Sequence, residues 1–385
     1  MLTASTKGDS DMQYREFGRT GIKISALGFG AMRLPSDNTG EKNVMKVEES
    51  IKIIRRAFQL GVNYIDTAPY YCDGESEVIV GKALKGWRDK VYLSTKNPVE
   101  DNSGEHWRER LEKSLKKLDT DYIDFYHMWG ISWDTYVNSI NVKDGPLEAA
   151  LKAKEEGLIK HISFSFHDAP ENLLKLIDTE NFETLLCQYN LLDRSNENAI
   201  AYAGKKGLGV VIMGPVGGGR LGAPSETIRN LLPGKVSSSA EIALRFVLSN
   251  PDVTCALSGM NSIEMVEENI RVASNETPLT ADELVRINDS VEENKRMADL
   301  YCTGCNYCMP CPTGINIPLN FQVMNYHRIY KITEYAKDQY SQIGKADWMK
   351  GKKAEECIEC GLCEEKCPQK IEIRKQLKET AQALG

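Results

Sequence analysis

Short apolar runs alternate with longer amphipathic segments from residue 14 to about residue 275. Each short run has five to seven residues and is rich in branched or aromatic side chains, which is typical of buried strands. Eight strands are predicted, at residues 26–30, 63–67, 91–95, 122–128, 161–165, 184–188, 209–213 and 253–257.

The segments between these strands repeat their apolar positions with the period of a helix buried on one face. They cover residues 46–61, 76–86, 106–119, 145–157, 170–177, 196–207, 237–250 and 262–273. Eight strand–helix units predict an α/β fold of the (β/α)8 TIM barrel type. An open doubly wound sheet is the alternative, but the units lack the glycine-rich dinucleotide fingerprint that would favour it.

Both ends of the chain depart from this alternation. The first 11 residues have the composition of a disordered leader, and a hairpin over residues 14–27 precedes the first barrel strand. A capped amphipathic helix at 280–300 leads out of the barrel, and residues 317–356 have a helical pattern rich in aromatic side chains. The expected divisions are a leader (1–11), the barrel (12–280), a linking helix (281–299) and a mostly helical domain (300–385).

Charge narrows the partners that the chain is expected to have. The formal net charge is −7; residues 300–385 carry 12 Lys and Arg against 10 Asp and Glu, or +2, which leaves −9 for the rest. Neither part has a basic stripe, which argues against a nucleic-acid partner. No apolar run is long enough to span a membrane, and the N-terminus lacks the features of a secretory signal. We therefore expect a cytoplasmic protein with no membrane partner.

The cysteines are distributed unevenly. Three of the 11 are scattered through the first 300 residues, at positions 72, 187 and 255. The other eight form two runs, "CTGCNYCMPCP" and "CIECGLCEEKCP". In a reducing compartment, closely spaced cysteines indicate a metal site more often than disulfides.

The second run has the spacing C-x2-C-x2-C-x3-C-P of bacterial ferredoxins, in which the fourth cysteine binds the other cluster of a pair. The first run is one residue shorter before its last cysteine. We therefore predict a ferredoxin-like domain with two [4Fe–4S] clusters. Cluster one would take Cys302, Cys305, Cys308 and Cys367, and cluster two would take Cys357, Cys360, Cys363 and Cys311. Zinc is the main alternative, although structural zinc sites usually show separated ligand pairs.

In a TIM barrel the active site lies at the carboxyl ends of the strands. Asp66 and Lys96 are at the ends of the second and third predicted strands, and Tyr71 follows five residues after Asp66. A rim ion pair beside a packing aromatic would explain these three residues without any chemistry.

The motifs "IDTAPYY", "YLSTKNP", "DYIDFY", "LCQYNLLDR", "VIMGPVGGGRL" and "LSGMNSIEMVEENI" occur in this order along the chain. In this order they resemble the aldo/keto reductases over residues 12–280. The two cysteine runs resemble a bacterial subgroup of that family with a ferredoxin-like C-terminal domain. The resemblance implies that Tyr71 donates a proton to a carbonyl oxygen, that Lys96 tunes its pKa, and that Asp66 anchors Lys96. An adjacent ammonium favours the phenolate, so we expect Lys96 to lower the tyrosine pKa from about 10.

The family's catalytic tetrad also includes a histidine at the end of the fourth strand. Here Trp129 occupies that position, and His127 lies two residues earlier on the same side of the strand. His127 is the candidate for the fourth role, and a buried structural histidine is the alternative. His167, just past the fifth strand, is a rival.

The resemblance also implies a nicotinamide site that includes Asp66 at its catalytic end. The other matching positions are Ser165, Gln188, Met213, Pro215, Val216, Gly217, Ser258, Gly259, Met260, Glu268 and Asn269. The basic residues that commonly hold the 2′-phosphate of NADP are replaced by Gly259 and Met265, which weakens the case for NADP. Arg271 is a candidate to compensate.

These expectations describe an iron–sulfur oxidoreductase that reduces a carbonyl or conjugated C=C bond of a small organic substrate with NAD(P)H. One alternative is a flavin- or ferredoxin-linked enzyme in which the clusters relay single electrons, with a ferredoxin-like donor as partner. A second is an electron-transfer module with a non-catalytic barrel.

Overall fold

The computed structural model describes residues 12–38, 43–191, 193–217, 230–232, 236, 238–274, 279–297, 302, 308–346, 348–367 and 371–385. The predicted leader, residues 1–11, lies outside them. By its internal contacts the chain divides into two compact units, residues 1–217 with 243–278 and residues 218–242 with 279–385. The expected domain boundaries stay a prediction beside this division.

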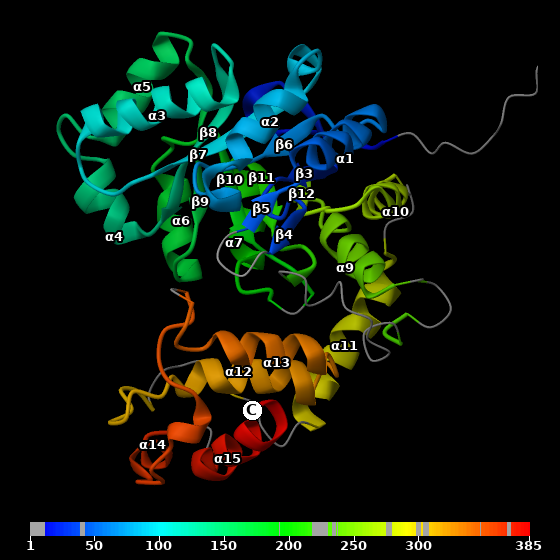
Figure 1. The fold of residues 1–385 in the computed structure, drawn as a ribbon, viewed down its shortest axis with the longest axis vertical. Coiled ribbons are helices and arrows are strands. Elements are labelled where there is room, and N and C mark those ends of the chain that lie inside the picture. The colour runs from blue at the N-terminus through cyan, green and yellow to red at the C-terminus, as the bar shows by residue number, and fades with distance from the viewer. Residues whose placement is uncertain are drawn as a thin grey trace, which may run out of the picture. The chain divides into compact units, whose positions relative to one another are not determined.

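The first unit contains a closed barrel of parallel strands (Figure 1). Its strands are β3 (Leu27–Gly30), β6 (Tyr64–Asp66), β7 (Tyr92–Pro98), β8 (Ile123–Ile131), β9 (Ile159–Phe166), β10 (Thr184–Gln188), β11 (Gly209–Met213) and β12 (Cys255–Ser258). β12 pairs in parallel with β3 and so completes the circle. The predicted TIM barrel is confirmed, and the alternative of an open sheet is wrong.

A helix lies along the chain after each barrel strand from β6 onward, and α1 precedes β6. The helices are α1 (Val47–Gln59), α2 (Ser76–Leu84), α3 (Gly104–Leu118), α5 (Pro146–Glu155), α6 (Pro170–Asp178), α7 (Glu197–Lys205), α9 (Ser239–Leu248) and α10 (Ile263–Ala273). Local sequence explains several starts: Ser103 and Ser262 cap α3 and α10, and proline opens α5 and α6.

Two features of the first unit were not predicted. A small hairpin, β4 (Ser36–Asn38) with β5 (Asn43–Met45), follows the first barrel strand. A short helix α4 (Trp133–Thr135), continued by a π-helical turn (Tyr136–Ile140), lies between β8 and α5.

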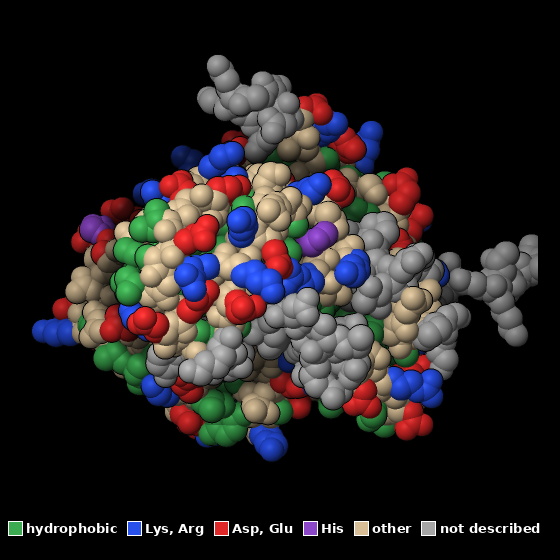
Figure 2. All heavy atoms as spheres, turned by 90° about the horizontal axis from the view of Figure 1, so that it is seen from below, with side chains coloured by type: hydrophobic (Ala, Val, Ile, Leu, Met, Phe, Trp, Pro, Cys, Tyr) green, Lys and Arg blue, Asp and Glu red, His purple; other side chains and the backbone are tan. Residues whose placement is uncertain are grey.

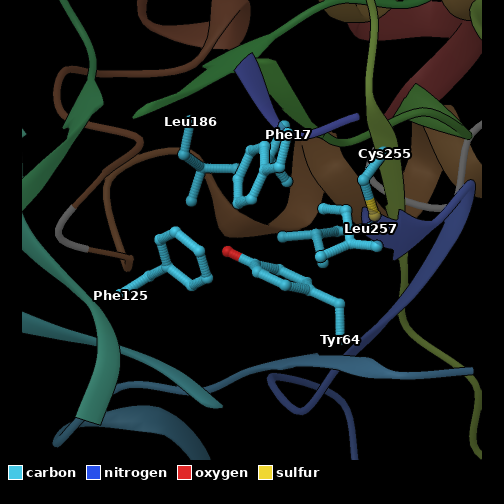
Figure 3. Packing of buried hydrophobic residues seen from close by; sticks show 8 residues of the cluster. Phe17, Tyr64, Phe125, Leu186, Cys255 and Leu257 are labelled. Atoms are coloured by element: carbon cyan, nitrogen blue, oxygen red, sulfur yellow. The ribbon is translucent and has the colours of Figure 1, made fainter. Parts of the chain in front are cut away.

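The N-terminal hairpin closes the end of the barrel opposite the carboxyl ends of the strands. It consists of β1 (Tyr14–Glu16) and β2 (Lys23–Ser25), joined by a 3-10 turn (Gly18–Thr20). Phe17 from this turn packs so tightly on the first residue of β11 that a Cβ at Gly209 would lie 2.1 Å from its ring. Figure 3 shows Phe17 beside Tyr64 and Phe125 in the buried cluster that it joins. The hairpin does not cover the opposite end, where the carboxyl ends of the strands lie, and that end is the expected place of the active site.

The second unit is mostly helical. It contains α11 (Ala281–Met297), α12 (Ile317–Arg328), α13 (Thr333–Gln342), a 3-10 turn (Ala354–Glu356), α14 (Leu362–Glu365) and α15 (Ile373–Leu384). α12 packs against both α13 and α15 (Figure 1). The predicted helix at 280–300 corresponds to α11. The predicted helical pattern at 317–356 was not divided, and it contains α12, α13 and the 3-10 turn, whereas α15 was not predicted.

On the face drawn in Figure 2, Lys and Arg side chains are interspersed with Asp and Glu. Among the described residues, no helix is both long and apolar enough to cross a membrane.

Candidate functional site

A buried ion pair lies at the carboxyl ends of β6 and β7. Lys96 Nζ donates to Asp66 Oδ1 and, over 2.8 Å, to the carbonyl oxygen of Thr67. Ser94 Oγ donates to the other carboxylate oxygen of Asp66 over 2.8 Å. The backbones of Asp66 and Ser94 are direct neighbours in the sheet, so strand register brings these groups together. Both Lys96 and Asp66 are buried, at 1% and 3% exposure.

Tyr71 lies beside this pair. It opens the short 3-10 turn Tyr71–Gly74 after β6, and Lys96 Nζ lies 4.8 Å from the centre of its ring. The next two residues, Cys72 and Asp73, have φ of 54° and 53°, a left-handed backbone that is costly outside glycine. The structure therefore brings together the three residues that the sequence placed at the rim.

The pKa of Tyr71 differs from the expectation. Burial raises it, and Lys96 lowers it by a smaller amount, so the pKa lies above its ordinary value of 10.0. The pKa of Lys96 is also raised, because Asp66 and Tyr71 together outweigh the opposing effect of its burial. At neutral pH the pair consists of a protonated phenol and an ammonium group, as a proton donor and its electrostatic partner require.

His127 lies deeper in the barrel, on β8 next to Lys96 in register. It is fully buried, and its Nε2 lies 2.9 Å from Ser94 Oγ. Because the single hydroxyl proton of Ser94 goes to Asp66, Nε2 is the donor of this bond. Nδ1 has no hydrogen-bond partner among the described residues. Burial lowers the His127 pKa to about 4, so the imidazole is neutral.

A β-bulge shapes β8 just beyond His127. Met128 pairs with Phe164 and Ile131 with Phe166, so three steps on β8 face two on β9. Within the bulge Gly130 has φ +62°, and its N–H donates to Ser165 Oγ over 2.7 Å. Trp129 packs edge-on against Tyr71, with ring centres 5.8 Å apart. Trp129 thus forms a wall beside the candidate proton donor.

His167 lies next to the bulge, just after β9. A Cβ on Gly130 would lie 3.6 Å from His167 Cδ2, and the histidine is exposed. Its pKa is lowered, first because the protein atoms around the imidazole partly desolvate it and then by the charge of Lys96. Of the two candidate histidines, His167 is the exposed residue and His127 the fully buried one.

The positions expected to hold nicotinamide lie at the ends of β9, β10 and β11. Gly214 follows Met213 with φ +63°, and a Cβ there would lie 2.7 Å from the amide of Gln188. The Gly217 N–H donates to the Gly214 carbonyl over 2.8 Å, which closes a turn containing Pro215 and Val216. The rest of the predicted glycine-rich loop, residues 218–221, lies outside the described residues.

Sequence reasoning missed Asn190. This fully buried residue follows β10, and its Nδ2 donates to the Gly214 carbonyl over 3.1 Å. It therefore ties the β10 end to the β11 turn. A polar side chain two residues past a strand end was the signal that could have found it.

The expected adenosine end follows β12. Ser258 Oγ accepts a 3.0 Å hydrogen bond from Asn269 Nδ2 on α10, which also carries Glu268. Gly259 comes next, and the side chain of Met260 is fully buried.

The cysteine loops of the second unit surround a cavity of about 460 Å³, counted with its open mouth. All four cysteines assigned to cluster two line it, namely Cys311, Cys357, Cys360 and Cys363. Cys308 lines it as well. Cys305, predicted for cluster one, lies outside the described residues, whereas Cys302 and Cys367 are within them.

The loop backbone and charges of this cavity suit a cluster. The Glu359 N–H donates to Cys357 Sγ over 3.4 Å, and Cys311 Sγ lies 3.3 Å from the Thr313 hydroxyl. Burial, Glu364 and the neighbouring thiols raise the pKa of Cys363, so gathered thiolates repel one another until a cationic core binds them. The described cysteines are free thiols, and no three described His, Cys, Asp or Glu side chains converge as ligands of one ion.

Two family models match the chain. Residues 26–292 match the aldo/keto reductase family, and residues 301–372 match a 4Fe-4S dicluster domain. The second match supports iron–sulfur clusters in the C-terminal part.

Known proteins resemble the chain over most of its length. YqkF, an uncharacterized oxidoreductase of Bacillus subtilis, is 29% identical, over 74% of this chain and 98% of its own. The holo form of the aldo-keto reductase AKR11C1 from Bacillus halodurans is 31% identical, with a TM-score of 0.63, and covers 72% of this chain and 96% of its own. An aldo/keto reductase from Klebsiella pneumoniae in complex with NADP and acetate is 25% identical, with a TM-score of 0.59, over 71% and 93% of the two chains.

Proposed function

Because the chain belongs to the aldo/keto reductase family, we propose that its barrel reduces the carbonyl group, or the conjugated C=C bond, of a small organic substrate with NAD(P)H. That the chain is an oxidoreductase follows from the family and its relatives, so a non-catalytic barrel is set aside. The observation that carries the finer proposal is the buried Asp66–Lys96 pair beside Tyr71.

Tyr71 is the proposed proton donor. When bound, the reduced nicotinamide supplies a hydride to the substrate carbon. The substrate oxygen then gains negative charge, and the Tyr71 hydroxyl gives it a proton. The phenolate that remains lies beside the ammonium of Lys96, which stabilises it electrostatically. Asp66 and the Thr67 carbonyl hold that ammonium in place.

A polar group is also needed to orient the substrate carbonyl. His127 stays a candidate for the fourth role, and its hydrogen bond to Ser94 supports an action through the Asp66 network. His167 is exposed and lies within the field of Lys96, which supports it as the imidazole that contacts substrate. Trp129 would supply an apolar wall for a flat carbonyl compound or enone.

For the nicotinamide, Ser165 and Gln188 are proposed to bind the carboxamide and Met213 to pack on the ring. The Gly214–Gly217 turn would lie against the pyrophosphate, and Ser258, Glu268 and Asn269 would contact the adenosine. Two observations support this assignment: these residues lie at the carboxyl ends of β9 to β12, and the Klebsiella relative binds NADP.

The second unit is proposed to hold two [4Fe–4S] clusters with the cysteine sets stated above. The cavity that contains all four cysteines of cluster two supports this assignment. Purification without oxygen should yield about eight irons and eight sulfides per chain, four of each for every cluster. Zinc without sulfide would contradict the assignment.

A relay of single electrons through the clusters is the second candidate. Cys360 is exposed, so the redox centre of a ferredoxin-like donor can approach cluster two. Mixing dithionite-reduced protein with a substrate that NAD(P)H reduces, and following the cluster absorbance, tests this candidate. Clusters that stay reduced exclude the relay.

The catalytic proposal is tested with a panel of carbonyl compounds and enones, assayed with NADH, with NADPH and with reduced ferredoxin. Tyr71→Phe should reduce turnover by several hundredfold or more, a loss typical of a general acid, and leave nucleotide affinity nearly unchanged. Tyr92→Phe, a phenol on β7 that is not part of the site, is the matched control. If Tyr71→Phe kept most of its kcat, the proton would have to come from another group.

A further inference from the structure

We propose that Arg33 holds the 2′-phosphate of NADPH and makes NADPH, rather than NADH, the preferred reductant. This inference rests on the proposed nicotinamide site. It concerns a residue that is not among the nicotinamide positions assigned from the family resemblance, and it differs from the expectation that the loss of two basic residues weakens the case for NADP, with Arg271 as the candidate to compensate.

The barrel closure brings Arg33 to the adenosine end. β3 pairs with β12 along Leu27–Phe29 and Ala256–Ser258, so the loops that follow these strands meet at the same rim. Gly30, the last residue of β3, is close enough that a Cβ there would lie 3.4 Å from the Ser258 carbonyl oxygen. Arg33 follows three residues later.

Gly259 provides the surface on which Arg33 lies. A Cβ on Gly259 would be 3.6 Å from Arg33 Cβ, 3.7 Å from Cδ and 3.8 Å from Cγ. The aliphatic stem of Arg33 therefore runs along the position where the usual basic residue is absent. Because Gly259 has no side chain, there is room for Arg33, from the loop after the neighbouring strand β3, to place its positive charge at this position.

The guanidinium of Arg33 is available for a ligand. The residue is exposed, and its side chain makes no hydrogen bond or ion pair within the described part of the chain. A planar guanidinium binds two phosphate oxygens at once, and a phosphate monoester near neutral pH carries between one and two negative charges.

The other positive groups near this end are less well placed. Arg271 is in the last turn of α10, and the helix has 11 residues. At about 1.5 Å per residue, its backbone is roughly 12 Å along the axis from the Ser262 end that faces Gly259. At that end the Met265 N–H already donates to Ser262 Oγ over 3.3 Å, so one backbone donor of the helix start has a partner.

The experiment compares nucleotide binding to the full-length protein, purified without oxygen, by titration with NADPH and with NADH. Arg33→Met keeps the stem and removes the charge. It should weaken NADPH binding by about 10- to 100-fold, the range expected for a lost hydrogen bond to a charged group, and change NADH binding by less than about threefold. Arg33→Lys should restore part of the NADPH affinity.

Arg271→Met is the matched control and should leave both affinities nearly unchanged. An equal loss of NADPH and NADH binding in Arg33→Met would overturn the assignment, because it would show that Arg33 binds the pyrophosphate that both nucleotides share. Unchanged NADPH affinity, or a loss only in Arg271→Met, would also overturn it. Wild-type protein that binds neither nucleotide would overturn the proposed function itself, and this assignment with it.

Discussion

Lys96 shows at the scale of one residue why the proposed catalytic arrangement needs a complete set of partners. A buried ammonium is costly unless an opposite charge and hydrogen bonds compensate it. Asp66 and the Thr67 carbonyl compensate it here, and Ser94 and His127 extend the network from the other side of the carboxylate. The positive charge beside Tyr71 is therefore built into the barrel before any ligand binds.

The neutral His127 makes stability depend on pH. Its folded pKa of about 4 lies below its ordinary value of 6.5, so the unfolded chain takes up a proton first as the pH falls. This contribution to stability is complete above about pH 6.5 and is lost progressively down to about pH 4. Between about pH 7 and pH 5 it should lower the free energy of unfolding by about 2 kcal/mol.

Denaturant unfolding of wild type and His127→Asn at both pH values measures this difference, because Asn cannot take up the proton. His106→Asn is the control of opposite sign: Asp101 raises the pKa of this exposed histidine, so its removal should make the fall in stability at low pH larger, not smaller. Equal pH dependence in wild type and His127→Asn would show that His127 is not held neutral.

At the scale of elements, the bulge in β8 organises one side of the rim. Its extra residue shifts the register against β9, and Gly130 takes the left-handed backbone that the bulge requires. The same glycine bonds to Ser165 and leaves space for His167. One local irregularity thus positions a candidate nucleotide contact and a candidate substrate contact together.

Gly130→Ala should therefore affect both stability and the site. A side chain in the left-handed region costs about 1–2 kcal/mol, and the added methyl would contact His167. Gly86→Ala is a matched control, because Gly86 has φ +78° and a Cβ there would meet nothing within 4 Å. Both variants should lose similar stability in a thermal melt, whereas only Gly130→Ala should weaken nucleotide binding or turnover. If both variants had the same activity, the bulge would have no role in the functional site.

At the scale of the whole molecule, the barrel and the second unit differ in what stabilises each of them internally. The barrel has a continuous apolar core, part of which surrounds Phe17, Tyr64 and Phe125. In the second unit, the cysteine loops bring several thiols to one cavity. Thiolates gathered in this way are stabilised by metal binding, so that unit should depend on its clusters for folding.

Removing the clusters should therefore unfold the second unit and leave the barrel folded. We expect protein treated with oxidant and chelator to lose helical circular dichroism and to bind NADPH within about threefold of the untreated affinity, because the proposed nucleotide residues lie on barrel strands and turns. A mock-treated sample is the control. Loss of NADPH binding together with the clusters would show that the barrel site depends on them.

Local sequence patterns determined the strand and helix positions and the spacing of the cluster ligands. The eight strands and eight helices were predicted close to their observed bounds, because apolar periodicity is a property of neighbouring residues. The order of motifs predicted Asp66, Tyr71 and Lys96 as site residues. The cysteine spacing predicted four ligands of one cluster, and the structure places all four of these cysteines around one cavity.

Only the tertiary structure decided which of these groups meet and in what state. The raised pKa of Tyr71 follows from its burial, whose effect is larger than that of Lys96. The exposure of His167 and the burial of His127 follow from the packing of β8 against β9. Arg33 contacts Gly259 because the barrel closes between β3 and β12. Burial, electric field and contact between distant residues depend on the distances that folding creates. A pattern of neighbours in the sequence does not contain those distances.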